Sequence, residues 1–265
     1  MDLSVSGKVY MIAGASRGLA YAIAKVLVQD GAHVSIASTS RETIDSAAKR
    51  LRQVAHTDSE VLACVCDVTD PVAISAWHSK TIAKFNGLDG LVVNAGGPPP
   101  GNFDNFNDDE VWQSAFELTL LSAVRLIRAV LPDLRARGAG SILTMTSSSV
   151  KEPIDYLLLS NVMRSGVTSL AKSLSQQLAS ENIRVNNLVP GIIETDRITA
   201  LATAQAEAND ISVDQQKDHM QSSIPMGRFG QADEFGRAGA FLLSPAASYI
   251  SGSTLVVDGG TMRSV

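Results

Sequence analysis

The stretch Val9-Tyr10-Met11-Ile12-Ala13-Gly14-Ala15-Ser16-Arg17-Gly18-Leu19-Ala20 decides the fold of this chain. Its first five residues are apolar and predict a short buried strand. Its glycines predict a tight turn into a helix that continues through Leu27 and ends at Asp30-Gly31. Such a turn directs the free backbone N–H groups of the helix, and the positive end of the helix dipole, at one place above the sheet. A pyrophosphate group suits that place.

The composition of the 265 residues indicates small molecules as partners. The formal net charge is −5 and no run of basic residues occurs, so a nucleic-acid partner or an anionic membrane surface has no electrostatic support. No apolar run is long enough to cross a bilayer, and the first strand starts near Lys8, which leaves no room for a secretory signal. We therefore expect a cytoplasmic protein that binds a small-molecule substrate.

The two cysteines are predicted to be free. Cys64 and Cys66 stand two apart in an apolar run, where a strand points both in the same direction at a separation unfavourable for a disulfide. We expect structural thiols here, and we predict no metal site.

Strands and helices are expected to alternate along the whole chain. Further apolar runs predict strands at 33–37, 61–65, 88–93, 141–145, 183–189 and 254–257, and the periodicity between them predicts helices at 41–55, from near 71, at 108–137, at 155–180 and at 233–243. This alternation is typical of the α/β class: a single Rossmann-type domain over residues 1–265, with a doubly wound parallel sheet of about seven strands and helices on both faces. The polar segment 194–223 breaks the rhythm and is expected to form a partly helical substrate lid.

Five motifs in order resemble the short-chain dehydrogenase/reductases. They are Gly14-x-x-x-Gly18-x-Ala20, Asp67-Val68, Asn94-Ala95-Gly96, Pro190-Gly191-Ile192-Ile193-Glu194-Thr195 and Val257-Asp258-Gly259-Gly260. The resemblance covers essentially the whole chain. It implies a nicotinamide cofactor and a homotetramer or homodimer, with the helices at 108–137 and 155–180 at one interface.

The resemblance also assigns the cofactor contacts. It places Asp67 and Val68 at the adenine ring, Asn94 to Gly96 at the adenosine ribose, and Ile193 and Thr195 at the nicotinamide amide. The full predicted set is Gly14, Ser16, Arg17, Gly18, Leu19, Ser38, Thr39, Asp67, Val68, Asn94, Ala95, Gly96, Arg164, Pro190, Gly191, Ile193 and Thr195. A structural alternative stays open for two motifs, since Asn94 to Gly96 could form a simple turn and Asp67 could cap a helix.

The end of the second strand predicts NADP(H) as the cofactor. A form that uses NAD carries a carboxylate there, which accepts from the ribose 2′-hydroxyl and repels a 2′-phosphate. This chain has Ala37-Ser38-Thr39-Ser40-Arg41 instead, with no acid, and Arg17 lies in the nearby glycine turn. Arg41 is the less certain contact, because an arginine at a helix start is usually only solvated.

The positions that carry the family's chemistry depart from its pattern. The family uses an Asn, a Ser, a Tyr and a Lys, of which the Tyr gives a proton to the carbonyl oxygen. In this chain the Ser is Ser147, the Tyr position is Ser160, the Lys position is Arg164 and the Asn position is Thr119. A serine hydroxyl is far too weak an acid to replace a phenol, and an arginine stays charged, so Arg164 can hold ribose hydroxyls only.

Other side chains could take over part of the chemistry. Asp155 could supply a proton or act as a helix N-cap, and Tyr156 could be a displaced donor on one helix face with Ser160 or could pack against a neighbour. Arg125 interrupts an apolar helix face, where it could reach the site or pair with an acid at a subunit contact. His219 in the lid is more typical of solvated surface. The candidate catalytic residues are therefore Ser147, Asp155, Ser160, Arg164 and Arg125.

Two functions follow from this pattern. The first is an NADP(H)-dependent oxidoreductase that transfers a hydride to an iminium carbon or an activated carbonyl, because an iminium becomes a neutral amine without any proton donor. Ser160-Asn161-x-x-Arg164 resembles an atypical subgroup that includes bacterial oxoacyl-reductase-like proteins and fungal iminium reductases of indole-alkaloid biosynthesis, some of which steer a cyclisation. The second is a sensor or scaffold that binds NADP(H) without redox turnover.

Overall fold

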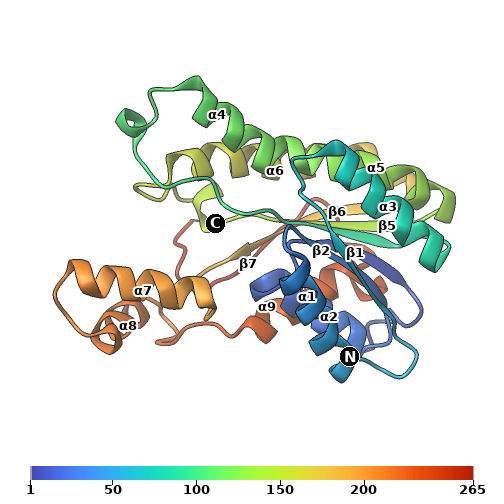
Figure 1. The fold of residues 1–265 in the computed structure, drawn as a ribbon, viewed down its shortest axis with the longest axis horizontal. Coiled ribbons are helices and arrows are strands. Elements are labelled where there is room, and N and C mark those ends of the chain that lie inside the picture. Colours follow the sequence, from blue (N-terminus) through green and yellow to red (C-terminus); the bar gives the residue numbers. More distant parts are fainter. Residues whose placement is uncertain (1, 265) are drawn as a thin grey trace.

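The computed structural model describes residues 2–264, which form one seven-stranded sheet (Figure 1). The strands are β1 (Val9–Ala13), β2 (His33–Ser38), β3 (Val61–Val65), β4 (Gly90–Val93), β5 (Gly140–Met145), β6 (Ile183–Pro190) and β7 (Thr254–Val257). All neighbours pair in parallel in the order β3-β2-β1-β4-β5-β6-β7. The predicted Rossmann-type fold class is confirmed.

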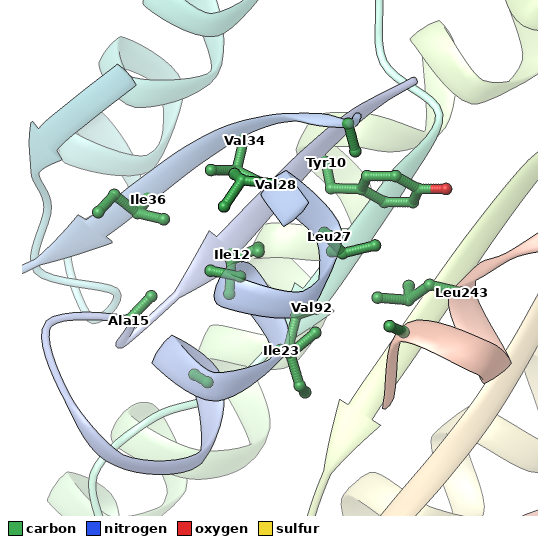
Figure 2. Close-up of a cluster of buried hydrophobic side chains, with 14 of the residues drawn as sticks. Tyr10, Ile12, Ala15, Ile23, Leu27, Val28, Val34, Ile36, Val92 and Leu243 are labelled. Carbon is green, nitrogen blue, oxygen red and sulfur yellow. The ribbon is translucent and has the colours of Figure 1, made fainter. Parts of the chain in front are cut away.

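The first strand shows why both faces of the sheet need helices. Its five residues are all buried, and successive side chains point to opposite faces. Tyr10 and Ile12 join the core on one side, whereas Val9, Met11 and Ala13 join the core on the other. Figure 2 shows the first of these cores, where Ile12 of β1 and side chains of β2 lie close to helix α1.

Helices cover each face of the sheet (Figure 1). The α-helices are α1 (Gly18–Gln29), α2 (Arg41–Val54), α3 (Pro71–Phe85), α4 (Asp109–Phe116), α5 (Ser122–Arg137), α6 (Leu158–Gln177), α7 (Asp196–Ala208), α8 (Val213–Ser222) and α9 (Ala232–Leu243). Buried side chains of α1, α2 and α9 share one core, and those of α3, α5 and α6 share the other. Within residues 2–264, none of these helices combines the length and apolar character that a membrane crossing requires.

The order in which strands are added to the sheet reverses at β1: β2 and β3 lie on one side of it, and β4 to β7 lie on the other. Ligands of such sheets bind outside the carboxyl ends of the strands at this switch point. Helices α7 and α8, inside the segment 194–223, pack on each other and project beyond the sheet at the left of Figure 1.

The expected helix at 108–137 is interrupted. Its first part, α4, passes into a π-helical turn, Glu117–Leu121, before α5 continues. Such π-helical turns are rare in proteins, but those that occur often lie at functional sites. Hydrophobic periodicity does not reveal them. Thr119, at the family's Asn position, lies in this turn.

The expected helix at 155–180 begins later than predicted, at Leu158. Gly101 donates its backbone N–H to the carbonyl of Tyr156 at 2.8 Å and accepts from the N–H of Leu158 at 3.2 Å. The carbonyl of Tyr156 and the N–H of Leu158 are therefore bonded to Gly101 and are not available for a further turn of helix. Tyr156 has a φ of 62°, in the left-handed region, so it cannot share a helix face with Ser160.

The two cysteines agree with the prediction, since both are free and buried. Burial, followed by the charges of Asp67 and Asp70, raises the pKa of the Cys66 thiol to about 12. A thiol with such a pKa is a poor nucleophile at neutral pH.

Candidate active site

The glycine turn after β1 is locked to the end of β4 by one side chain. Gly14 has a φ of 62°, and a Cβ added there would lie 2.5 Å from Nδ2 of Asn94. The Asn94 Nδ2 donates to the carbonyl of Ala13 at 3.3 Å. Only glycine fits at this position, because the backbone conformation and the close amide both exclude a side chain.

A cavity of about 620 Å³ opens above this turn. Eleven predicted cofactor residues line it: Gly14, Ser16, Arg17, Gly18, Leu19, Asn94, Ala95, Gly96, Arg164, Pro190 and Thr195. Gly191 and Ile193 line a neighbouring cavity instead, while Ser38, Thr39, Asp67 and Val68 line neither. The structure therefore brings most of the predicted residues together in one cleft.

Arg17 and Arg50 bring positive charge to the glycine turn. Arg17 is exposed and lies 3.9 Å from Asp196 at the start of α7. Arg41 pairs with Asp45 on its own helix at 3.6 Å, which fits the solvated alternative. Arg50 of α2 was missed by sequence reasoning: its Nη2 donates to the carbonyl of Ser16 at 3.0 Å. No local pattern distinguishes Arg50 from other helix-surface arginines, because only the packing of α2 brings it to the glycine turn.

Asp67 organises the turn after β3 and is not a helix cap. Its Oδ1 accepts from the backbone N–H of Thr69 at 2.9 Å and from the Thr69 hydroxyl at 2.8 Å. The N-cap of α3 is Asp70, which accepts from the N–H of Val72 at 2.8 Å. The helix-cap alternative for Asp67 is therefore wrong.

A second cavity, of about 510 Å³, adjoins the cofactor cleft and is named the substrate cavity after the role proposed for it below. Ser147, Ser160 and Arg164 line it, and Arg164 also lines the cofactor cleft. The Arg164 Nε donates to Oγ of Ser160 at 3.2 Å, and its Nη1 lies 3.3 Å from the carbonyl oxygens of Met145 and Thr146. The predicted pair at the family's Tyr and Lys positions is thus hydrogen-bonded and buried at the junction of the two cavities.

Arg164 keeps its positive charge at neutral pH in spite of its burial. Burial away from water is the larger cause and the positive charge of Arg197 the smaller cause that lower the pKa of Arg164 to about 10. A Cβ added at Gly97 would lie 3.6 Å from Nη2 of Arg197 and 3.9 Å from Nη2 of Arg164. The two guanidinium groups therefore flank Gly97 at the shared wall of the cavities.

Thr119 and Ser147 complete the positions of the family's chemistry. The Thr119 hydroxyl is buried and has no hydrogen-bond partner among residues 2–264. It borders a small void of about 10 Å³ together with Asn94 and Arg164. The Ser147 hydroxyl lies on the substrate cavity and accepts from the backbone N–H of Ser149 at 3.2 Å.

The remaining candidates lie away from both cavities. Asp155 is exposed and lines neither, and the N-cap position of α6 is Leu157, so Asp155 is not the helix cap either. Tyr156 is 55% exposed and also lines neither. Arg125 donates to the carbonyl of Thr69 at 2.5 Å, a structural contact. His219 lies exposed on α8. The catalytic roles predicted for Asp155 and Arg125 gain no support from this geometry.

Glu152 is an acid of the substrate cavity that sequence reasoning missed. Its Oε1 accepts from the backbone N–H groups of Arg263 and Ser264, each at 2.7 Å. These bonds lower the pKa of the Glu152 carboxyl group. They connect residues 111 and 112 positions apart, so no local spacing could have indicated them.

The lining of the substrate cavity is poor in proton donors. Its ionisable side chains are Glu152, Arg164, Arg197 and Asp258. No tyrosine, histidine, lysine or cysteine occurs among the described residues that line it. Apolar side chains supply much of the remaining wall, among them Pro98, Pro153, Ile154, Leu157 and Met262.

The comparisons with known proteins agree with this architecture. Residues 14–262 match the model of the family described as enoyl-(acyl carrier protein) reductase. The chain is 33% identical over 262 residues to dehydrogenase/reductase SDR family member 4 from Sus scrofa, a match that covers 97% of this chain and 88% of that protein.

Two solved structures are also similar. L-sorbose reductase from Gluconobacter frateurii, complexed with NADPH and L-sorbose, has a TM-score of 0.94 and 32% identity over 100% of both chains. A short-chain oxidoreductase from Pseudomonas aeruginosa PAO1, described as containing an atypical catalytic center, has a TM-score of 0.90 and 28% identity, covering 98% of this chain and 99% of that one. With the family model matching nearly the whole length, this chain belongs to the short-chain dehydrogenase/reductase family of oxidoreductases.

Proposed function

We propose that this protein is an NADP(H)-dependent reductase that delivers a hydride to a carbon–nitrogen double bond of an iminium ion. The observation that carries the proposal is the pair Ser160–Arg164, which replaces the family's acidic phenol in a cavity without another neutral acid. An activated carbonyl compound is the second substrate class that this site would accept.

The residues present fit a nicotinamide dinucleotide with a 2′-phosphate. Gly14 and Gly18, both at positive φ, leave backbone N–H groups open above the turn, and the end of β2 carries hydroxyls and no carboxylate. Arg17 and Arg50 supply positive charge at the same turn. The similarity to a reductase complexed with NADPH supports this choice. When bound, NADPH would supply the hydride.

The proton balance of the site favours an iminium substrate. Hydride addition to a ketone forms an alkoxide that needs a proton, whereas hydride addition to C=N⁺ forms a neutral amine directly. Arg164 is a charged group that already donates to Ser160, and Glu152 is ionised at neutral pH because its carboxylate accepts backbone hydrogen bonds. Neither group is a suitable general acid, so a substrate that needs none fits best.

The remaining residues have positioning roles in this proposal. Ser147 presents its hydroxyl to the substrate cavity, and Arg164 would hold hydroxyl groups of the cofactor from the shared wall. Helices α7 and α8 would form the lid, since Arg197 and Leu201 of α7 line the substrate cavity. The similarity to a short-chain oxidoreductase described as containing an atypical catalytic center is consistent with a departure from the usual residues. We further propose a homotetramer or homodimer, as the family resemblance implies, and a substrate whose reduction can be coupled to a cyclisation.

Oxidation of NADPH, followed by its absorbance at 340 nm, tests the proposal. The substrates are a cyclic N-alkyl iminium ion, a ketone of the same ring size and a vicinal diketone. We expect turnover of the iminium ion above its uncatalysed rate and little turnover of the simple ketone. Efficient reduction of the ketone alone would contradict the proposal. Tight binding of NADPH without turnover of a broad panel would indicate the sensor or scaffold instead.

A further inference from the structure

The substrate cavity has positive residues that it shares with the cofactor cleft and negative residues that it does not share. Arg164 and Arg197 line both this cavity and the cofactor cleft, so both guanidinium groups lie on the shared wall. Glu152 and Asp258 line the substrate cavity but not the cofactor cleft. The wall shared with the cofactor cleft is therefore positive, which suits phosphate groups, and both acids belong to the part of the lining outside this shared wall.

The C-terminal tail holds both of these acids. Glu152 accepts from the N–H groups of Arg263 and Ser264, and Asp258 accepts from the N–H groups of Gly260 and Met262 at 2.9 and 2.7 Å. Neutral backbone donors hold both carboxylates, and neither forms an ion pair within residues 2–264. Their charge is thus fixed in place without a directly paired cation, although the charge of Arg263 also acts on Glu152.

Glu152 is the better placed of the two to meet a substrate. Asp258 belongs to the turn after β7, where its side chain bonds only to the turn that follows it. Glu152 stands beside Pro153 and Ile154 in the segment between Ser147 and Ser160. All five residues line the cavity. The Glu152 side chain is only partly covered, so water weakens its attraction for a cation, but the carboxylate is a fixed negative charge on a partly apolar wall.

We propose that Glu152, held by the C-terminal tail, selects substrates that carry a positive charge next to the reacting carbon. The inference rests on the proposed function and deepens it, because it names the residue and the charge that determine substrate choice. A neutral substrate of equal shape would leave the carboxylate without a countercharge. A substrate carboxylate would be repelled.

The role of Glu152 is positioning and selection rather than proton transfer. Hydride addition removes the positive charge of the iminium ion, so Glu152 stabilises the bound substrate more than the transition state. Replacing Glu152 by Gln should therefore raise KM by about tenfold while kcat stays the same or rises slightly. A merely structural residue would change kcat and KM for all substrates alike.

The kinetic test compares Glu152→Gln with Glu110→Gln, which makes the same change on the exposed surface of α4, outside both cavities. KM and kcat are measured with a cyclic iminium ion and with a neutral vicinal diketone, which belongs to the activated carbonyl class that the site would also accept. We expect the KM for the iminium ion to rise in Glu152→Gln alone, and the KM for the neutral diketone to stay within about twofold. An equal rise for both substrates, or none for either, would overturn the inference.

A second variant tests the part played by the tail. Ser264→Pro removes one N–H donor to Glu152 and leaves the carboxylate itself in place. We expect an increase in KM for the iminium ion that is smaller than that of Glu152→Gln. Wild-type KM in this variant would show that the tail does not position Glu152.

A binding measurement separates this inference from the proposed function. Calorimetry with the protein loaded with NADP⁺ gives the affinity for a quaternary cyclic ammonium ion and for its uncharged carbon isostere. If Glu152 selects charge, the wild type binds the ammonium ion more tightly, and Glu152→Gln loses about tenfold of that preference, whether or not any iminium ion is reduced. No preference in the wild type would refute the role of Glu152 even if iminium turnover is observed.

Discussion

The pair Ser160–Arg164 is the feature on which the proposed chemistry depends. Both residues lie on α6, and the Nε–Oγ distance of 3.2 Å keeps the two side chains together. A guanidinium group cannot lose a proton near neutral pH, and a serine hydroxyl is not acidic enough to give one. The pair therefore has a buried hydrogen bond, but neither of its residues can serve as a general acid.

Restoring the phenol should restore carbonyl chemistry. The double variant Ser160→Tyr with Arg164→Lys rebuilds the family's usual pair on the same helix. General acid catalysis is typically worth 10²–10⁴-fold, so we expect kcat/KM for a simple ketone to rise by about 100-fold. NADPH oxidation at 340 nm measures the rate. Arg164→Lys alone is the control and should show no gain, and an inactive double variant with a native circular dichroism spectrum would argue against the role assigned to position 160.

Glu152 predicts a pH dependence of the C-terminal tail. Its folded-state pKa is lowered by the hydrogen bonds from Ser264 and Arg263, so this contact is fully present above the ordinary glutamate pKa. Its contribution is lost as the pH falls from about 4.5 through the lower folded-state pKa. We expect the amide NMR signals of Arg263 and Ser264 to shift toward free-chain positions over this range. Signals that stay unchanged until the whole protein unfolds in acid would show that the carboxylate does not hold the tail.

At the scale of elements, the loop 151–157 depends on the helix that follows it. Asn161, in the first turn of α6, donates from Nδ2 to the carbonyl of Ile154 at 2.9 Å. Gly101 pairs with the same loop through Tyr156 and Leu158. These contacts explain why α6 starts at Leu158, and they hold Ile154 and Leu157 on the cavity wall.

Removal of the Asn161 amide should loosen this loop. In Asn161→Ala, we expect faster amide hydrogen exchange across residues 153–157 and a loss of about 1 kcal/mol in the free energy of unfolding, the usual value of one hydrogen bond. Exchange is measured by mass spectrometry and stability by urea denaturation. Ser165→Ala, which removes only a hydroxyl bonded to its own helix, is the control. Unchanged exchange across 153–157 would mean that Gly101 alone fixes the loop.

At the scale of the whole molecule, the sheet brings cations from distant parts of the chain to one place. Arg17 comes from the glycine turn and Arg50 from α2, while the net charge of the chain is −5. A local positive region on an acidic protein favours a phosphate at that region. Arg50 also stacks over the ring of Tyr21 at 4.7 Å, which fixes its direction.

This arrangement predicts a salt-sensitive preference for NADPH over NADH. We expect Arg50→Gln to weaken NADPH binding by about tenfold and to change NADH binding by less than about twofold, because only NADPH carries the 2′-phosphate. Fluorescence titration of the bound dinucleotide measures both Kd values. The control is Arg52→Gln, because Arg52 lies on the same helix but donates to the carbonyl of Val61. In the wild type, added salt should reduce the preference, and equal weakening of both cofactors would contradict the assignment.

The sequence by itself determined the fold and the cofactor cleft. Both rest on local patterns: apolar strands at 9–13 and 90–93, glycines that need positive φ, and motifs that follow strand ends in a fixed order. Because parallel strands end at one edge of a sheet, residues that follow different strands meet without further information. The buried contact of Ser160 with Arg164 follows equally from their spacing on one helix.

The tertiary structure alone decided which charges face the substrate. Asp155 and Glu152 stand three residues apart on one loop, yet only Glu152 lines the cavity, because the tail at Arg263 and Ser264 binds it there. Arg50 reaches the glycine turn, and Arg197 reaches Arg164, through the packing of whole helices. Such contacts join parts of the chain that are far apart in sequence, and neither spacing nor periodicity carries information about them.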